Sequence, residues 1–262
     1  MKSNTLTRRE WLRLGVTSLT GAALGTGLPM RALDPASRVS RPAVATGVPI
    51  RYLNTGQRHV VLTFDDMYSE YNTLRIALAC AQRGIRATFF PTGIAAENTL
   101  ERSGYQDLYR RLRDMGHEFG THLYTHRVLR DLTFDELVWQ EMHPALDVMR
   151  RSLGDDFVPV AMRPPYGIVT DAMKELSRQF DVPMVLWNLD SRDALCAANK
   201  YKSALVCCSE MLAIMRQKLA PGSIVLMHTI APSSLAIGPV ADLLARRNLK
   251  AVPLSQMLGS SA

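Results

Sequence analysis

Cysteine is scarce in this chain of 262 residues, which contains only Cys80, Cys196, Cys207 and Cys208. No two of them have the CxxC spacing, which argues against a cysteine-based metal site. Cys80 lies in an apolar helical stretch and is expected to be a small buried hydrophobe. In an oxidising compartment, Cys196 could form a disulfide with either Cys207 or Cys208, and the sequence does not choose between them.

Long apolar runs are also missing. The uncharged stretch from Leu14 to Leu28 is too short and too weakly apolar to predict a permanent membrane span. It follows Thr7-Arg8-Arg9-Glu10-Trp11-Leu12, which resembles a twin-arginine export signal more than an ordinary basic helix start. Residues 1–32 are therefore predicted to be a signal peptide, with a second possible cleavage position after Ala43-Val44-Ala45. No cysteine near either position supports a lipid anchor. The export machinery is an expected partner, and a bacterial periplasmic or secreted location is expected.

A strong positive charge is missing from the mature chain. The formal net charge is +7, but residues 1–32 carry five lysines and arginines against one glutamate, which leaves +3 without them. This is an ordinary surface charge, so no nucleic-acid partner is expected. Internal repeats and low-complexity tracts are absent as well. The 47% share of hydrophobic residues is enough for a sizeable core.

The pattern of apolar residues predicts an α/β fold. Residues 33–58 contain prolines and glycines without periodicity and are predicted to be a linker leading into a catalytic domain at 59–262. Beyond residue 58, apolar runs alternate with helical patterns, which is typical of a parallel sheet, closed or open. The expected strands are 59–64, 86–90, 117–121, 158–163, 183–188, 223–228 and, less clearly, 249–254. The expected helices are 71–83, 105–115, 134–152, 169–179, 202–219 and 236–247.

The best-marked helix begins at Thr133. Thr133 and Glu136 form the sequence pattern of a capping box, in which each side chain binds the other residue's backbone N–H. Apolar residues then recur at helical spacing up to Met149, and they are expected to face the core.

Two short stretches carry residues that could form one metal site. Asp65 and Asp66 end the strand 59–64, and successive residues of a strand point to opposite sides, so the two carboxylates should diverge. His122 and His126 follow a second strand end, after Gly120. Two histidines and one carboxylate leave a divalent metal with an open position, as a hydrolytic zinc site requires. Adjacent aspartates are often only a turn or a helix cap, and the histidine pair argues against that interpretation.

Five stretches at strand ends together resemble the polysaccharide deacetylase family, the NodB-homology carbohydrate esterases. The resemblance covers residues 59 to 228, most of the mature chain. Its motifs are Thr63-Phe64-Asp65-Asp66, His122-Leu123-Tyr124-Thr125-His126, Arg163-Pro164-Pro165-Tyr166-Gly167, Asp190-Ser191-Arg192-Asp193 and Leu226-Met227-His228. The resemblance implies a distorted (β/α) barrel with about seven parallel strands, whose C-terminal strand ends carry the chemistry.

The resemblance also implies roles for the first residues of this set. Asp66, His122 and His126 would hold a divalent metal, with zinc expected and cobalt or nickel as alternatives. Asp65 would be the general base that takes a proton from water. Arg163 would orient Asp65 through two parallel hydrogen bonds from its guanidinium.

The remaining residues would act on the substrate. The backbone N–H of Tyr166 would stabilise the oxyanion of a tetrahedral intermediate. His228 would be the general acid that protonates the departing amine, and Asp193 would fix its tautomer. Leu226 would line the pocket for the acetyl methyl group.

Four positions depart from the family pattern without removing a ligand or a catalytic side chain. Met67 replaces the glycine that usually follows the aspartate pair, and Leu123 replaces a serine or threonine, which removes a loop hydrogen bond. Ala194 replaces a tryptophan that walls the sugar groove, and Thr229 replaces an aspartate. The segment 194–208 is expected to form a loop that reshapes this groove.

The sequence therefore predicts an exported, metal-dependent enzyme that removes the N-acetyl group from an amino-sugar polymer or oligomer, such as peptidoglycan, chitin-like polymers or poly-N-acetylglucosamine. Three alternatives remain: the same barrel acting on a small cyclic amide or an O-acetyl ester, a non-catalytic carbohydrate-binding relative, and an iron-dependent oxygenase. The last would leave Arg163, Asp193 and His228 without roles. The sequence leaves the oligomeric state open.

Overall fold

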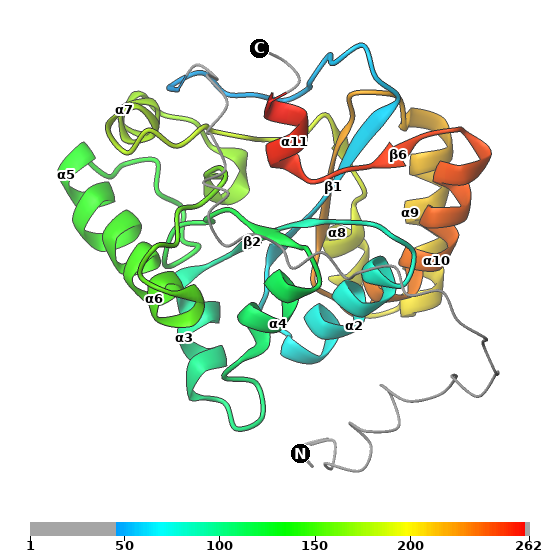
Figure 1. Ribbon diagram of the computed structural model, residues 1–262, viewed down its shortest axis with the longest axis horizontal. Helices are drawn as coiled ribbons and strands as arrows, with labels where there is room; N and C mark the ends of the chain where they lie inside the picture. Colours follow the sequence, from blue (N-terminus) through cyan, green and yellow to red (C-terminus); the bar gives the residue numbers. More distant parts are fainter. Residues whose placement is uncertain (1–45, 260–262) are drawn as a thin grey trace, which may run out of the picture. The chain divides into compact units, whose positions relative to one another are not determined.

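The computed structural model describes residues 46–259, so the predicted signal peptide and both expected cleavage positions lie outside the described residues. Within this range a parallel sheet lies among helices (Figure 1). Its strand order is β3-β2-β1-β5-β4, and β6 also pairs with β1. The strands are β1 (His59–Asp66), β2 (Thr88–Pro91), β3 (Glu118–Phe119), β4 (Leu189–Asp190), β5 (Ile224–His228) and β6 (Lys250–Ala251). The predicted parallel α/β fold is confirmed.

The strand β1 is central because neighbours cover it on both edges and both faces. Its residues from Val60 to Asp65 are all buried, as expected for an apolar strand in a parallel sheet. In the β1–β5 register Asp65 is the partner of His228, and in the β1–β2 register Asp66 is the partner of Pro91. The carboxyl ends of these strands therefore meet at one edge of the sheet.

Two expected strands, 158–163 and 183–188, are reduced to isolated bridges. Met162 bridges Thr121 on one side and Met184 on the other, and Val185 bridges Ile50, in each case in parallel. Prolines interrupt the ladder here, because Pro164 and Pro183 lack an N–H to donate. The pairings still run in order from β4 through β5, β1 and β2 to β3. Just after β3, Thr121 pairs with Met162, and Met162 pairs with Met184, a few residues before β4. This order is consistent with a distorted barrel.

Helices surround the sheet, and five of the six expected helices occur with shifted ends. In Figure 1, α9 and α10 lie side by side on one flank, and α5, α6 and α7 lie on the opposite flank. Three short helices, α3, α8 and α11, were not predicted. The helices are α2 (Glu70–Ala81), α3 (Gly93–Glu101), α4 (Leu108–Asp114), α5 (Phe134–Glu136), α6 (His143–Leu153), α7 (Asp171–Gln179), α8 (Asp193–Ala197), α9 (Ala204–Lys218), α10 (Ala231–Arg246) and α11 (Leu254–Gly259).

The expected helix 134–152 is not a single α-helix. The predicted capping box of Thr133 and Glu136 is present at its start. A π-helical segment, η1 (Leu137–Met142), then separates α5 from α6, and the N–H of His143 bonds to the carbonyl of Val138, five residues back. Pro144 at the start of α6 has no N–H for the ordinary four-residue bond, which favours the wider turn.

The interior of the sheet is filled by apolar side chains from successive strands. One cluster contains Val61 of β1, Phe90 of β2 and Ile224 of β5. Val185, from the bridged segment, and Met257 of α11 belong to the same cluster. Leu53 belongs to the same cluster and the N–H of Ile50 bonds to Met184. Residues 50–53, expected to be part of a linker, therefore pack on the barrel.

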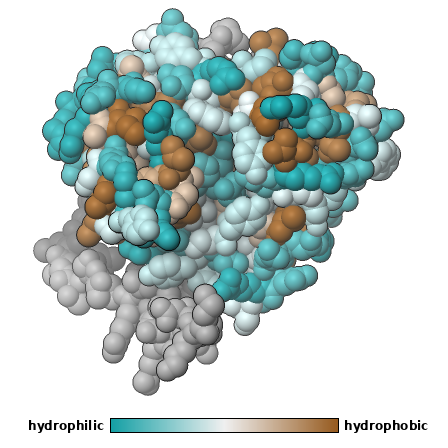
Figure 2. Space-filling model, turned by 180° about the vertical axis from the view of Figure 1, so that it is seen from behind, coloured by the Kyte–Doolittle hydropathy of each residue, from teal (hydrophilic) through white to brown (hydrophobic). Residues whose placement is uncertain are grey.

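On the face of the molecule seen from behind, exposed apolar residues lie in separate groups among hydrophilic residues (Figure 2). Large exposed hydrophobic side chains include Leu195 and Leu205, which lie on α8 and α9. Among residues 46–259, no helix has the length and apolar character that crossing a membrane requires.

Candidate active site

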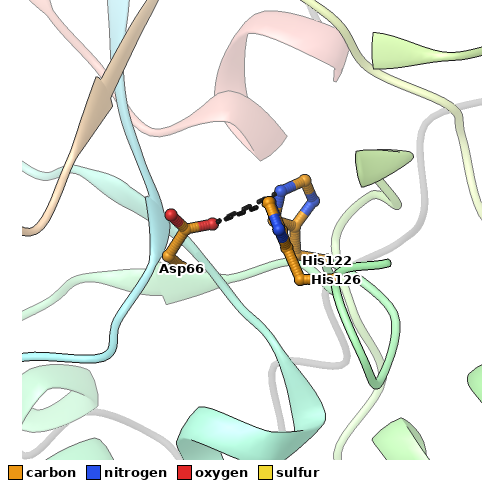
Figure 3. Close-up of side chains that lie close together, drawn as sticks. All are labelled: Asp66, His122 and His126. Carbon is orange, nitrogen blue, oxygen red and sulfur yellow. Dashed lines mark ion pairs between the residues drawn. The ribbon is translucent and has the colours of Figure 1, made fainter. Parts of the chain in front are cut away.

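The two adjacent aspartates at the end of β1 diverge, as strand geometry predicts. Asp65 is 2% exposed and its Oδ1 accepts a hydrogen bond from Arg163. Asp66 instead faces His122 and His126 (Figure 3). Asp66 adopts a left-handed backbone, with φ of 74°, where the strand ends and the chain turns. Strained backbone of this kind concentrates at functional sites.

Asp66, His122 and His126 form a cluster that can hold a metal ion. The Oδ1 atom of Asp66 lies 3.6 Å from Nε2 of His122 and 3.2 Å from Nε2 of His126. One ligand atom from each residue lies within 4.8 Å of the others. Oδ1 is buried, yet no described residue hydrogen-bonds to it. A buried oxygen without a donor, facing two imidazole nitrogens, fits a bound cation.

His122 is held in the tautomer that a metal requires. Its Nδ1 lies 2.6 Å from the carbonyl oxygen of Arg163, which can only accept, so Nδ1 carries the proton. Burial lowers the pKa of His122 below its ordinary value, in spite of the opposing charges of Asp65 and Asp66. The ring is therefore neutral, and the lone pair of Nε2 points toward Asp66.

Arg163 is completely buried and binds four oxygen atoms. Its Nη1 donates to Asp65 at 2.6 Å and to Thr63 at 2.8 Å. Its Nε and Nη2 donate to the carbonyls of Val185 and Leu186. The expected pair of parallel bonds to Asp65 is therefore wrong: Asp65 receives one bond, because the other donors are used on the backbone. The ring of Phe90, 4.2 Å from the guanidinium carbon, covers one face of Arg163.

His228 and Asp193 form a second ion pair near Asp65, in which the carboxylate is buried and the imidazole is partly exposed. Nδ1 of His228 lies 2.8 Å from Oδ1 of Asp193, whose Oδ2 accepts bonds from the His228 N–H and the Ser233 hydroxyl. Burial lowers the pKa of His228, but the hydrogen bond and charge of Asp193, with the charges of Asp65 and Asp66, outweigh it and raise the pKa to about 9. His228 is therefore protonated at neutral pH.

Tyr166 and Leu226 lie at the same edge of the sheet. The ring of Tyr166 is 4.8 Å from that of His126, and its backbone has a φ of 59°. The next residue, Gly167, is also left-handed and approaches Trp187 so closely that a Cβ would lie 2.8 Å from the indole. Leu226 is buried on β5, two residues before His228, and pairs with Asp190.

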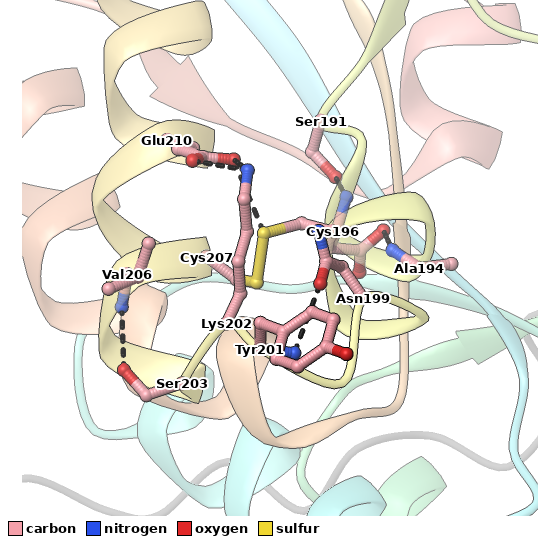
Figure 4. Close-up of a disulfide and its surroundings, with 11 residues drawn as sticks. Ser191, Ala194, Cys196, Asn199, Tyr201, Lys202, Ser203, Val206, Cys207 and Glu210 are labelled. Carbon is pink, nitrogen blue, oxygen red and sulfur yellow. Dashed lines mark hydrogen bonds and ion pairs between the residues drawn. A yellow bond between two sulfur atoms is a disulfide. The ribbon is translucent and has the colours of Figure 1, made fainter.

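A disulfide closes the loop after the fourth motif. Cys196 is bonded to Cys207 (Figure 4), which settles the choice that the sequence left open. Cys80 and Cys208 are buried thiols. Lys202 forms an ion pair with Glu210 of α9 next to this bond. An open hollow of about 750 Å³ borders the loop, lined by Ser191, Arg192, Leu195, Cys196, Ala198, Asn199, Lys202, Glu210, Ala213 and Ile214. The expected loop at 194–208 is therefore largely helical: residues 194–197 belong to α8, residues 204–208 begin α9, and the disulfide joins the two helices.

Three residues that support the site were not singled out from the sequence. Thr63 accepts a bond from Arg163, and Ser233 donates to Asp193. Glu141 accepts bonds from the loop between the two histidines. Thr63 begins the first motif but was given no role there, Ser233 lies outside the motifs, and Glu141 lies within a helical pattern. A charged residue between core positions Val138 and Met142 was the only available signal.

Comparison with known proteins agrees with this arrangement. The family model described as polysaccharide deacetylase matches residues 52–185. A peptidoglycan-N-acetylglucosamine deacetylase of Listeria monocytogenes is 26% identical over 220 residues, which cover 83% of this chain and 43% of the relative. The chain thus spans less than half the length of that relative.

Solved structures share the fold. The chitin deacetylase of the fungal pathogen Colletotrichum lindemuthianum superimposes with a TM-score of 0.72 and 25% identity over 82% of this chain and 93% of that one. A carbohydrate esterase family 4 pseudoenzyme from Bacillus anthracis has a TM-score of 0.70 and 21% identity over 82% of this chain and 70% of that one. The matched family model, the fold and the five motifs at the strand ends together lead to one conclusion: this chain belongs to the polysaccharide deacetylase family.

Proposed function

We propose that this protein is a metal-dependent hydrolase that removes the N-acetyl group from an amino sugar in a polymer or oligomer. One observation carries the proposal. One ligand atom each from Asp66, His122 and His126 lies within 4.8 Å of the others. Asp65 precedes Asp66 on β1, and His228 of β5 is the register partner of Asp65. A metal site with a carboxylate and a protonated imidazole beside it suits amide hydrolysis by water.

Asp66, His122 and His126 would hold the metal, for which zinc is proposed and cobalt or nickel would also serve. A divalent metal at such a site makes water more acidic and polarises a carbonyl oxygen. The proposed ligand atoms are Nε2 of His122, Nε2 of His126 and Oδ1 of Asp66, which accepts no hydrogen bond from the described residues.

Asp65 would be the general base. Its Oδ1 accepts a bond from Arg163, whereas its Oδ2 accepts no hydrogen bond from residues 46–259 and lies 3.8 Å from Nε2 of His122. Oδ2 would therefore take the proton of the attacking water, while Arg163 holds the carboxylate in one orientation.

His228 would be the general acid. Its Nδ1 is engaged by Asp193, so Nε2 would donate a proton to the departing nitrogen as the C–N bond breaks, releasing acetate and a free amine. The N–H of Tyr166 would stabilise the oxyanion, and Leu226 would contact the acetyl methyl group.

The proposed substrates follow from the named relatives, which deacetylate peptidoglycan and chitin according to their names. We expect acetate release from at least one of peptidoglycan, chitin oligosaccharides and poly-N-acetylglucosamine. Acetate should not appear after the metal is removed with a chelator, and Zn²⁺, Co²⁺ or Ni²⁺ should restore it. Undiminished release in excess chelator would contradict the metal-dependent mechanism.

A second candidate is the hydrolysis of a small amide or an O-acetyl ester. Ala194 favours it, because the tryptophan expected at this position would wall a sugar groove. Acetate release from simple acetyl esters, without release from any glycan, would select this alternative. A non-catalytic role is disfavoured, because the proposed base, acid and ligands are all present, although the fold also occurs in a pseudoenzyme.

Export by the twin-arginine route is proposed from Arg8 and Arg9. A reporter fused behind residues 1–45 should reach the periplasm, and replacing both arginines by lysine should retain it in the cytoplasm. Export that survives this change and depends on the general secretion pathway would contradict the proposal.

A further inference from the structure

We propose that Glu141 is a positioning residue that holds the loop between the two metal-ligating histidines in its binding conformation. This inference rests on the proposed metal site and does not depend on the substrate. Glu141 is completely buried on the π-helical segment η1, and α5, η1 and α6 all lie outside the five sequence motifs.

Within the described part of the chain, the hydrogen bonds that Glu141 accepts all come from this loop. Its Oε2 accepts from the N–H of Tyr124 at 3.0 Å and the N–H of Thr125 at 2.9 Å. Its Oε1 accepts from the hydroxyl of Thr125 at 2.6 Å and lies 3.4 Å from Nε of Arg127. The two N–H donors precede His126 and the guanidinium of Arg127 follows it, so one carboxylate fixes the peptide groups that lead into this ligand and pairs with the side chain of the next residue.

The loop needs such a partner because its backbone is strained. Leu123 has a φ of 61° and His126 a φ of 60°, left-handed conformations that are unfavourable for residues other than glycine. The start of α3 binds the opposite side of the loop, since the N–H groups of Gly93 and Ile94 donate to the carbonyls of Leu123 and Tyr124. Carbonyls are thus bound by α3 and N–H groups by Glu141.

The segment η1 also anchors the loop through apolar contacts. Leu123 is completely buried in a cluster with Leu137, Val138 and Met142 of η1. The sequence predicted that a leucine at this position costs a loop hydrogen bond, and here the side chain is instead packed against the element that carries Glu141. Pi-helical turns are frequent at functional sites. This one places both the carboxylate of Glu141 and the apolar side chains that contact Leu123 against the same loop.

The test compares Co²⁺ binding by the substrate-free protein, measured by cobalt absorption in competition with a chelator at a temperature well below unfolding. Glu141→Gln replaces one acceptor oxygen by an NH₂ group that faces other donors. We expect about 10- to 100-fold weaker Co²⁺ binding, as for lost supports of metal ligands. Glu136→Gln is the matched control: it weakens the exposed capping box of the same helix and should leave Co²⁺ affinity within twofold.

Thr125→Val serves if Glu141→Gln does not fold. It removes the short hydroxyl bond to Glu141, together with the longer bond that the same hydroxyl accepts from the N–H of Arg127, and should weaken Co²⁺ binding severalfold. Wild-type affinity in whichever of these two variants folds would overturn the positioning role. If the unaltered protein itself binds no Co²⁺, the proposed metal site and this inference both fail. Absence of acetate release with normal Co²⁺ binding would contradict only the proposed function.

Discussion

Asp65 and Asp66 show how two identical neighbours acquire different tasks. Asp66 faces the histidines through an unpartnered oxygen, and Asp65 is tied to Arg163. Asp65→Asn keeps the shape but removes the proposed base. We expect kcat to fall about 10²- to 10⁴-fold while Zn²⁺ affinity stays within severalfold, measured by acetate release and by metal titration.

The matched control for this change is His126→Ala, which removes a proposed ligand. Zinc affinity should then fall along with activity. The opposite pattern, with metal lost from Asp65→Asn and kept by His126→Ala, would show that the two roles have been assigned to the wrong residues.

The pair of His228 and Asp193 predicts the alkaline limit of activity. The pKa of His228 is raised to about 9, so a reaction that needs its proton should slow as pH rises through this value. Asp193→Asn removes a negative charge, which lowers the pKa of His228 and moves the limit to lower pH. The contribution of this pair to the free energy of unfolding depends on pH in the same direction. It is fully present below pH 6.5 and is lost as pH rises through about 9. A pH profile of kcat for both proteins tests this, and an unmoved limit would contradict the role of Asp193.

At the level of single residues, the sequence was sufficient where side chains sit at strand ends. Parallel strands bring their carboxyl ends to one edge, so Asp66, His122 and His126 could be placed together. Glu141 could not be found, because its role depends on a π-turn and a long-range contact with the loop. Ser233 was missed for a similar reason, since its partner Asp193 is 40 residues away.

The short strand β3 and the histidine loop that follows it form one element. Gly120 lies between them, and a Cβ there would lie 2.3 Å from the Phe90 ring and 2.7 Å from the carbonyl of Ala161. Gly120→Ala should therefore lower the free energy of unfolding by about 1–3 kcal/mol and displace the loop, which weakens Zn²⁺ binding.

Gly84→Ala is the control for this element. Its φ is 66° and a Cβ there would meet nothing within 4 Å, so only the backbone is strained, by about 1 kcal/mol. Denaturant unfolding should show a lower free energy of unfolding in both variants. Metal titration should show weaker Zn²⁺ binding only in Gly120→Ala. Equal Zn²⁺ affinity in the two variants would contradict the prediction that the packing of Gly120 positions the histidine loop for metal binding.

Among the elements, those with long apolar patterns were predicted well and those interrupted by proline were not. The strand β1 and the helix α9 occur close to their expected positions. The expected strand at 183–188 is bridged only at Met184 and Val185, because its pairing partners are distant and Pro183 cannot donate to them. Periodicity reports local burial and carries no information about the partner strand.

The whole molecule should respond to its metal. A ligand that binds only the folded state stabilises it by about 4 kcal/mol at a concentration a thousand times its Kd. We therefore expect Zn²⁺ to raise the Tm of the chelator-treated protein by several degrees and to leave His126→Ala unchanged. Calorimetry measures this directly. An equal rise in both proteins would show that zinc binds elsewhere.

Arg163 has a consequence for how such a protein can change over evolutionary time. It binds Asp65 and Thr63 of β1 and the carbonyls of Val185 and Leu186. The residue that orients the proposed base therefore also connects β1 to the segment at 185–186. Removing one partner of a buried ion pair costs about 3–5 kcal/mol. Loss of the partly exposed ring of His228 should cost less, because Asp193 still accepts bonds from the backbone N–H of residue 228 and from the Ser233 hydroxyl. A descendant that abandons catalysis should therefore discard His228 early and keep Arg163, so a surviving arginine at this position is weak evidence that a relative is still an enzyme.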